Sequence, residues 1–230
     1  MDTPDTLRLI LPLLAALLAG GCAATGTKPI DEAGPVAACD DSALPRDVVM
    51  HLDLIADMHE RGLHHAALAH LDALEPRASD IPRALYLRAE ALRRSGRGAE
   101  AAGLYRTLSQ GCLAALGHHG LARVALDENR REEGLRHLQA AVRVAPTDTR
   151  IRNDLGYALL LSNRPLEALA QFQTAVELGG GRQPFSNRLL ALLLLEREAE
   201  VQAVVREAGL SPAILVGLRE QAEVLRGEGP

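Results

Sequence analysis

The chain has 230 residues, of which 47% are hydrophobic and 2% are aromatic. Its formal net charge at pH 7 is −5, so it lacks the excess of Lys and Arg that general nucleic-acid binding requires. The scarcity of aromatic side chains also argues against base-stacking platforms and predicts an aliphatic core.

The amino terminus, residues 1–21, has the pattern of a bacterial signal peptide. Arg8 precedes an apolar run at 9–18, which is too short to span a bilayer but suits the core of a signal sequence. The small residues that follow end in Cys22 and resemble the lipobox of bacterial lipoproteins. This resemblance implies cleavage before Cys22 and lipidation of that cysteine. The alternative is a conventional secreted protein that is cut nearby.

Residues 22–47 are expected to form the lipidated cysteine and a flexible tether, because the stretch from Thr25 to Pro45 is rich in Gly, Pro, Ala and Asp. The cysteine is followed by Ala23, and the absence of Asp there resembles the outer-membrane retention pattern. The resemblance to lipoproteins implies three acyl chains on Cys22, and two or more acyl chains make attachment to a membrane durable. The predicted location is therefore the bacterial cell envelope, lipid-anchored on the periplasmic face of the outer membrane.

A helical hairpin is then repeated at almost constant spacing. The copies lie near residues 48–81, 82–114, 115–148 and 149–182, with a degenerate copy at 183–210. Each second helix begins with a small residue, and the set is Ala67, Ala101, Gly134 and Ala168. A large residue follows one turn later, and that set is Leu71, Tyr105, Leu138 and Phe172. The closely packed position of each first helix is Ile55, Ala89, Ala122 or Gly156.

This pattern resembles the tetratricopeptide repeat (TPR), whose period is about 34 residues. One such hairpin cannot bury its own apolar face, so the copies stack. The predicted fold is all-α, a right-handed TPR solenoid of paired antiparallel helices. The alternative is an ordinary helical bundle whose spacing is accidental.

Residues 211–227 are predicted to form a C-terminal capping helix. Ser211 supplies an N-cap and Pro212 a first-turn proline, and the amphipathic stretch from Ala213 to Arg226 ends at Gly227. A helix at this place covers the apolar face that the last repeat leaves open.

The chain has two further cysteines, Cys39 and Cys112. In an oxidising periplasm they form either a disulfide that joins the tether to the second repeat or two independent thiols, and the sequence leaves both alternatives open.

Candidate catalytic and metal-binding groups do not form a recognisable set. The histidines at His64-His65 and His118-His119 lack a completing Cys or carboxylate at metal-ligand spacing, so no metal site and no cofactor are expected. The glycines at 179–181 lack the Lys-Ser or Lys-Thr of a phosphate-binding loop. Without a nucleophile and base in a recognisable arrangement, the chain is predicted not to be an enzyme.

The repeat register predicts a binding surface on the first helices of the hairpins, because positions spaced along a 3.6-residue period share one stripe. The stripe comprises Arg83, Tyr86, Glu90, Arg93, His119, Arg123, Arg150, Asn153, Tyr157, Asn187 and Arg188. A basic, amide-lined groove predicts an acidic or carboxy-terminal peptide of a protein partner as its ligand. The alternative is a solvated helix face whose arginines pair with neighbouring Glu and Asp.

Two parts of the sequence carry a more specific resemblance. The best repeat opens with Asn153-Asp154-Leu155-Gly156, and the tail contains Asn187-Arg188-Leu189-Leu190-Ala191-Leu192 followed by Leu210-Ser211-Pro212-Ala213 and Leu218-Arg219. These segments are similar to TadD lipoproteins of the tight-adherence (Flp) pilus system. The resemblance implies a scaffold that assists assembly of the pilus or its outer-membrane secretin, loosely analogous to the pilotin PilF.

The expected partners are therefore the secretin or other pilus-assembly proteins, together with the membrane through the lipid anchor. No nucleic acid and no small-molecule substrate are expected. An alternative function is that of a TPR lipoprotein that recruits peptidoglycan-modifying enzymes or serves polysaccharide export.

Overall fold

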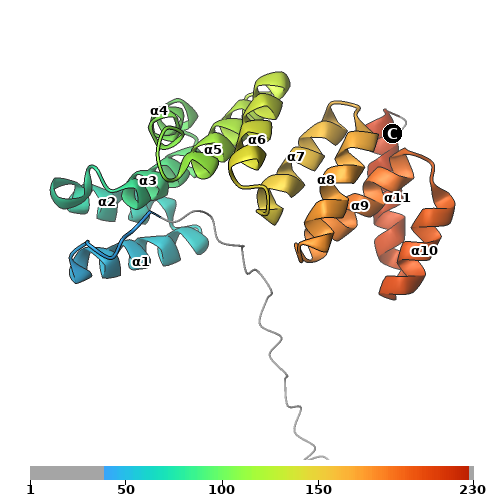
Figure 1. The fold of residues 1–230 in the computed structure, drawn as a ribbon, viewed down its shortest axis with the longest axis horizontal. Helices are drawn as coiled ribbons and strands as arrows, with labels where there is room; N and C mark the ends of the chain where they lie inside the picture. Colours follow the sequence, from blue (N-terminus) through green and yellow to red (C-terminus); the bar gives the residue numbers. More distant parts are fainter. Residues whose placement is uncertain (1–38, 228–230) are drawn as a thin grey trace, which may run out of the picture. The chain divides into compact units, whose positions relative to one another are not determined.

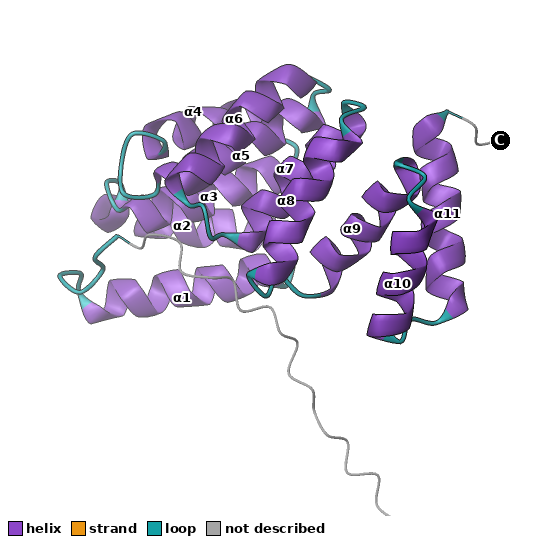
Figure 2. Cartoon of the chain, turned by 45° about the vertical axis from the view of Figure 1, so that its right-hand side comes forward, coloured by secondary structure: helices purple, strands orange, loops and turns teal. Residues whose placement is uncertain are grey.

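The computed structural model describes residues 39–227, and this part of the chain contains helices and loops without a strand (Figure 2). The helices follow one another in chain order (Figure 1). They are α1 (Arg46–Glu60), α2 (His64–Ala78), α3 (Pro82–Arg94), α4 (Gly98–Leu108), α5 (Ala114–Asp127), α6 (Arg131–Val144), α7 (Thr149–Leu161), α8 (Pro165–Glu177), α9 (Arg182–Leu194), α10 (Glu198–Ala208) and α11 (Pro212–Arg226). The predicted all-α array of paired helices is confirmed.

Each pair of helices, from α1 and α2 to α9 and α10, is joined by a three-residue turn of one design. The central residue of the turn has a positive φ in every pair, and the five residues are Gly62, Gly96, Asn129, Asn163 and Glu196. The amide after it bonds to the carbonyl five residues earlier, as from Arg164 to Leu159 at 2.9 Å, which closes the end of the first helix. Glycine and asparagine tolerate this left-handed conformation, which explains their place at the turns.

Glu196 is the exception, since it holds φ 58° without the freedom of glycine. We expect Glu196→Gly to raise the free energy of unfolding by roughly 0.5–1 kcal/mol, because the left-handed strain is removed. Chemical denaturation of the two proteins measures the difference. Glu196→Asn should also stabilise the protein, because Asn163 occupies the equivalent position at φ 55°. A less stable glycine variant would contradict this reading of the turn.

The core depends on small residues where helices cross. A Cβ added to Gly156 of α7 would lie 2.5 Å from the ring of Phe172 in α8, so only glycine fits at this crossing. The aromatic ring of Tyr105 in α4 also packs against a glycine, but this glycine is Gly120 of α5, in the next pair. Ile55, the bulky residue of the first copy, is fully buried. The buried apolar residues form two large clusters, one from α1 to α5 and one from α5 to α11, and a small third cluster of Ala115, Ala141 and Ile151.

The helix α11 follows the last pair and packs against α9. Pro212 begins the helix, and Gly227 follows its end in the left-handed conformation with φ 78°. The side chain of Ser211 makes no capping hydrogen bond, in contrast to the sequence-based expectation. Leu218 and Ala222 provide its buried side.

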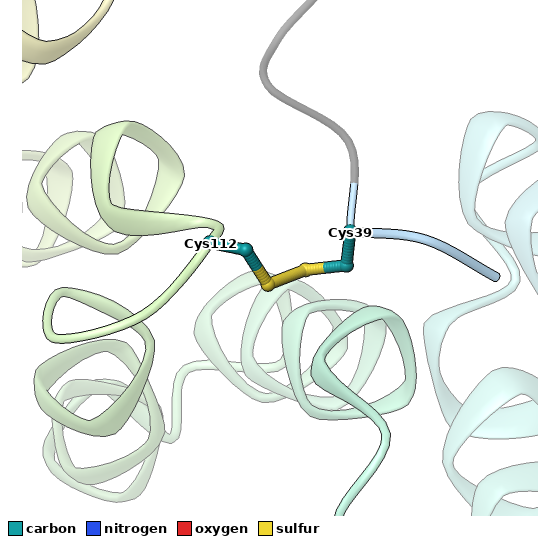
Figure 3. Close-up of a disulfide and its surroundings, with 2 residues drawn as sticks. All are labelled: Cys39 and Cys112. Carbon is teal, nitrogen blue, oxygen red and sulfur yellow. A yellow bond between two sulfur atoms is a disulfide. The ribbon is translucent and has the colours of Figure 1, made fainter.

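Residues 39–45, which belong to the predicted tether, are attached to the array. Cys39 packs against the core of the first pairs and forms a disulfide with Cys112 in the loop between α4 and α5 (Figure 3). Asp41 lies 3.7 Å from Arg83 of α3. Of the two alternatives for these cysteines, the structure contains the disulfide, which holds residue 39 to the loop before α5.

The predicted signal peptide at 1–21, Cys22 and the tether up to residue 38 lie outside the described residues. Between residues 39 and 227, each helix is too short or too polar to cross a membrane.

Candidate functional site

The first helices of successive pairs are connected by polar contacts between residues about one repeat apart. From α1 to α9, the contacts are Arg83 to Asp53 (2.6 Å), Arg123 to Glu90 (3.1 Å), His119 to Asp154 (2.7 Å) and Asn187 to Asn153 (2.8 Å). The repeat spacing places these side chains at similar heights on neighbouring helices. Much of the predicted binding stripe is therefore engaged in contacts between repeats.

Glu90 of α3 is the centre of a polar cluster, and it is only 4% exposed. The hydroxyl of Tyr105 donates to its Oε1 at 2.5 Å. Arg123 Nη1 donates to both carboxylate oxygens at 3.2 and 3.1 Å, and Arg93 Nη2 donates at 3.4 Å. His59 Nε2 lies 3.6 Å from Oε2. Helices from the first three pairs thus converge on one carboxylate.

The ionisation of Glu90 follows from these neighbours. Burial by itself raises the pKa of Glu90, but the His59 contact, the charge of Arg123, the Tyr105 hydrogen bond and the charge of Arg93 hold it well below its usual range. Glu90 is therefore both buried and ionised. Burial, together with the negative charge of Glu90, raises the pKa of Tyr86 to about 12.

A pocket of about 450 Å³ lies between α5, α7, α9 and α11, with α6 behind it. We call it the amide pocket. Its lining consists of Arg123, Leu126, Leu138, Asn153, Asp154, Tyr157, Ala158, Gln183, Ser186, Asn187, Leu218 and Gln221. Its volume falls within the usual range for ligand sites. The lining combines amide side chains with leucines from three helices.

Four residues of the predicted stripe line the amide pocket, namely Arg123, Asn153, Tyr157 and Asn187. The remaining predicted residues, Arg83, Tyr86, Glu90, Arg93, His119, Arg150 and Arg188, are not among its lining. Two of these correct the sequence-based picture, because the side chains of Glu90 and Arg93 are 5% and 8% exposed and face each other. They cannot offer a ligand the open surface that the stripe predicted.

The arginines of the stripe largely contact carboxylates. Arg93 also reaches Asp127 at 3.2 Å, and Arg150 lies 3.4 Å from Asp148, the N-cap of α7. Arg83 and Arg123 have the partners given above. Among the described residues, Arg188 makes no ion pair, and its Nε is buried without a hydrogen bond. The structure therefore shows the paired alternative for four of the five arginines.

Several residues of the amide pocket were missed by sequence reasoning. Both Gln183 and Ser186 lie on α9; Gln183 is one turn before Asn187, so the helical period of the degenerate copy could have indicated it, whereas Ser186 directly precedes Asn187. Leu218 and Gln221 come from α11. This helix lies outside the repeats, so the repeat register carries no information about the side that it presents to α9.

Six of the eight histidines lie in pairs, each between the two helices of one hairpin. The pairs are His51 with His70 (2.9 Å between ring nitrogens), His59 with His64 (3.2 Å) and His118 with His137 (5.7 Å between ring centroids). Across residues 39–227, no three His, Cys, Asp or Glu side chains gather in a way that could hold a metal ion.

A family model described as a tetratricopeptide repeat matches residues 60–110 and 119–185. The chain belongs to the tetratricopeptide repeat family. This TPR protein is also 37% identical over 188 residues to the TPR repeat-containing protein PA4299 of Pseudomonas aeruginosa, covering 81% of this chain and 72% of the relative. TPR proteins bind protein partners and are generally not enzymes.

Two solved structures illustrate the shared fold. PilF of Pseudomonas aeruginosa has a TM-score of 0.61 at 19% identity, over 79% of this chain and 85% of PilF. MamA of Desulfovibrio magneticus has a TM-score of 0.54 at 18% identity, over 77% of this chain and 96% of MamA. At these identities the similarity concerns the arrangement of helices.

Proposed function

We propose that this TPR protein is an accessory lipoprotein of a Tad/Flp-type pilus and binds a segment of the secretin, or of another assembly protein, in the amide pocket. The observation that carries the proposal is the pocket itself. It is formed by the first helices of consecutive pairs, contains predicted binding residues from three of them, and has α11 on one side. Such a site can hold a protein segment without any catalytic group.

Two further points support the pilus assignment. The tail segments that resemble TadD lie in α9 and α11, and these helices line the amide pocket. The PilF structure has the same type of helical array. Attachment through lipidated Cys22 would bring the pocket to the periplasmic face of the outer membrane, where a secretin is assembled.

Arg123 and Gln221 both line the amide pocket but differ in their contacts. Arg123→Ala would remove a partner of buried Glu90 and destabilise the array, so a loss of binding would have two explanations. Gln221 is better suited, because it lines the amide pocket and makes no hydrogen bond with the described residues. A tryptophan at this position occupies pocket volume without breaking an existing contact.

We expect tagged full-length protein to capture the secretin or another pilus-assembly protein from solubilised envelope, and Gln221→Trp to lose this capture. The matched control is Gln139→Trp, because Gln139 is exposed on α6 and does not line the amide pocket. Mass spectrometry identifies the captured proteins, and circular dichroism verifies folding. Equal capture by both variants would exclude the pocket. Peptidoglycan enzymes or polysaccharide-export proteins captured in place of pilus proteins would support the alternative function.

A further inference from the structure

The charged side chains at the amide pocket already have partners. Arg123 donates to Glu90, and Asp154 lies 2.7 Å from His119. Burial by itself raises the pKa of Asp154, but the contact with His119 and the charge of Arg123 hold it below the usual value. Glu90 and Asp154 are thus both ionised beside Arg123. The pocket has no surplus of positive charge to offer an acidic ligand.

The polar groups that remain free in the pocket are uncharged. Ser186, Gln221 and Tyr157 make no hydrogen bond with any residue in the described range, and they come from three different helices. An amide both donates and accepts, and a hydroxyl does the same. These groups therefore match the alternating N–H and C=O groups of an extended peptide backbone. Asn153 and Asn187 also line the pocket, and Asn187 Nδ2 donates to Asn153 Oδ1 at 2.8 Å.

The pocket also has an apolar part in its lining. Leu126, Leu138, Ala158 and Leu218 belong to four helices and belong to, or pack against, the same core cluster. Leu138 is fully buried and Leu218 is 8% exposed, so this apolar part of the lining is closely packed. It provides a place for one apolar side chain of a bound segment, as ligand sites combine apolar walls with a few polar groups.

We infer that the partner segment in the amide pocket is uncharged and extended, with one apolar side chain directed at the leucines. The inference rests on the proposed function of this pocket as a peptide site. It replaces the acidic segment predicted from the arginines, because four of these five arginines contact carboxylates within the array and the fifth, Arg188, does not line the pocket. Binding should then depend little on ionic strength, since salt screens charge pairs and not amide contacts.

A random peptide library displayed on phage and selected against the full-length protein tests the inference. We expect the selected peptides to lack Asp and Glu and to share one apolar position. Their affinity should change less than about twofold when the NaCl concentration is raised. Acidic peptides whose affinity falls roughly tenfold or more with salt would overturn the inference but leave the pocket a peptide site. Peptides that bind equally well to Gln221→Trp would contradict the proposed function itself.

Two variants that introduce a charge at Gln221 provide an independent test with the same peptides. Gln221→Lys and Gln221→Glu both remove the free amide, so both should weaken an uncharged segment by roughly tenfold. An acidic segment would instead bind Gln221→Lys more tightly and Gln221→Glu more weakly, and that result would overturn the inference. The thermal midpoint of each variant, compared with that of Gln139→Lys, shows whether the array is intact.

Discussion

Replacing Glu90 by alanine is expected to lower the free energy of unfolding by about 3–5 kcal/mol. The carboxylate is 4% exposed and accepts hydrogen bonds from Tyr105, Arg93 and Arg123. Its removal leaves a buried hydroxyl without an acceptor and two cations without their central anion. Urea denaturation followed by circular dichroism measures the loss.

Glu100 provides the matched control. It contacts Arg97 through two hydrogen bonds of 2.7 Å, but both side chains are more than half exposed. An exposed pair is solvated in the unfolded and the folded state, so Glu100→Ala should change stability little. Similar losses for Glu90→Ala and Glu100→Ala would show that burial is not the deciding factor, and no loss for Glu90→Ala would contradict the account of the cluster.

The pH dependence of stability also follows from the lowered pKa of Glu90. A carboxyl with a lower pKa in the folded state contributes stability that is fully present above its unfolded pKa, about 4.3 for glutamate. The contribution is lost as pH falls from there through the folded pKa. Wild-type protein should therefore lose stability on acidification more steeply than Glu90→Gln. Identical acid profiles would show that Glu90 is not ionised in the folded protein.

The array could be predicted from the sequence because each pair of helices requires a small residue and a large residue at the same repeat positions. Gly156 and Phe172 were identified as a small and a large residue at a crossing, and they are in contact. The turns at Asn129 and Asn163 can also be recognised in a sequence, since left-handed positions select few residue types. Repetition makes such local requirements stand out from an otherwise Ala-rich and Leu-rich chain.

The charge state of the binding surface could not be predicted in the same way. An arginine on a helix has carboxylates within reach on its own helix and on both neighbours, and the sequence does not decide among them. Arg123 lies close to Asp127 in sequence, yet its partner is Glu90, 33 residues away. Tyr105 likewise contacts Gly120 of the next pair and Glu90 of its own pair. Pairings of this kind depend on side-chain geometry between repeats.

Reducing the disulfide between Cys39 and Cys112 is expected to have a similarly large effect. The bridge closes a loop with a sequence separation of 73, which contains α1 to α4. In the chain-entropy model, a loop of this length restricts the unfolded chain enough to stabilise the folded state by about 4 kcal/mol. Urea denaturation with and without dithiothreitol measures the difference.

The effect should be concentrated in the first two pairs, because a repeat array is held together by contacts between neighbours. Hydrogen exchange in α1 and α2 should accelerate on reduction more than exchange in α7 and α8, which lie outside the closed loop. The Cys39→Ser/Cys112→Ser double variant serves as the control, since dithiothreitol has no bond to break there. Uniform acceleration along the array would mean that the repeats unfold as one unit. An unchanged unfolding midpoint would mean that Asp41, Arg83 and the packing of residue 39 hold this segment without the disulfide.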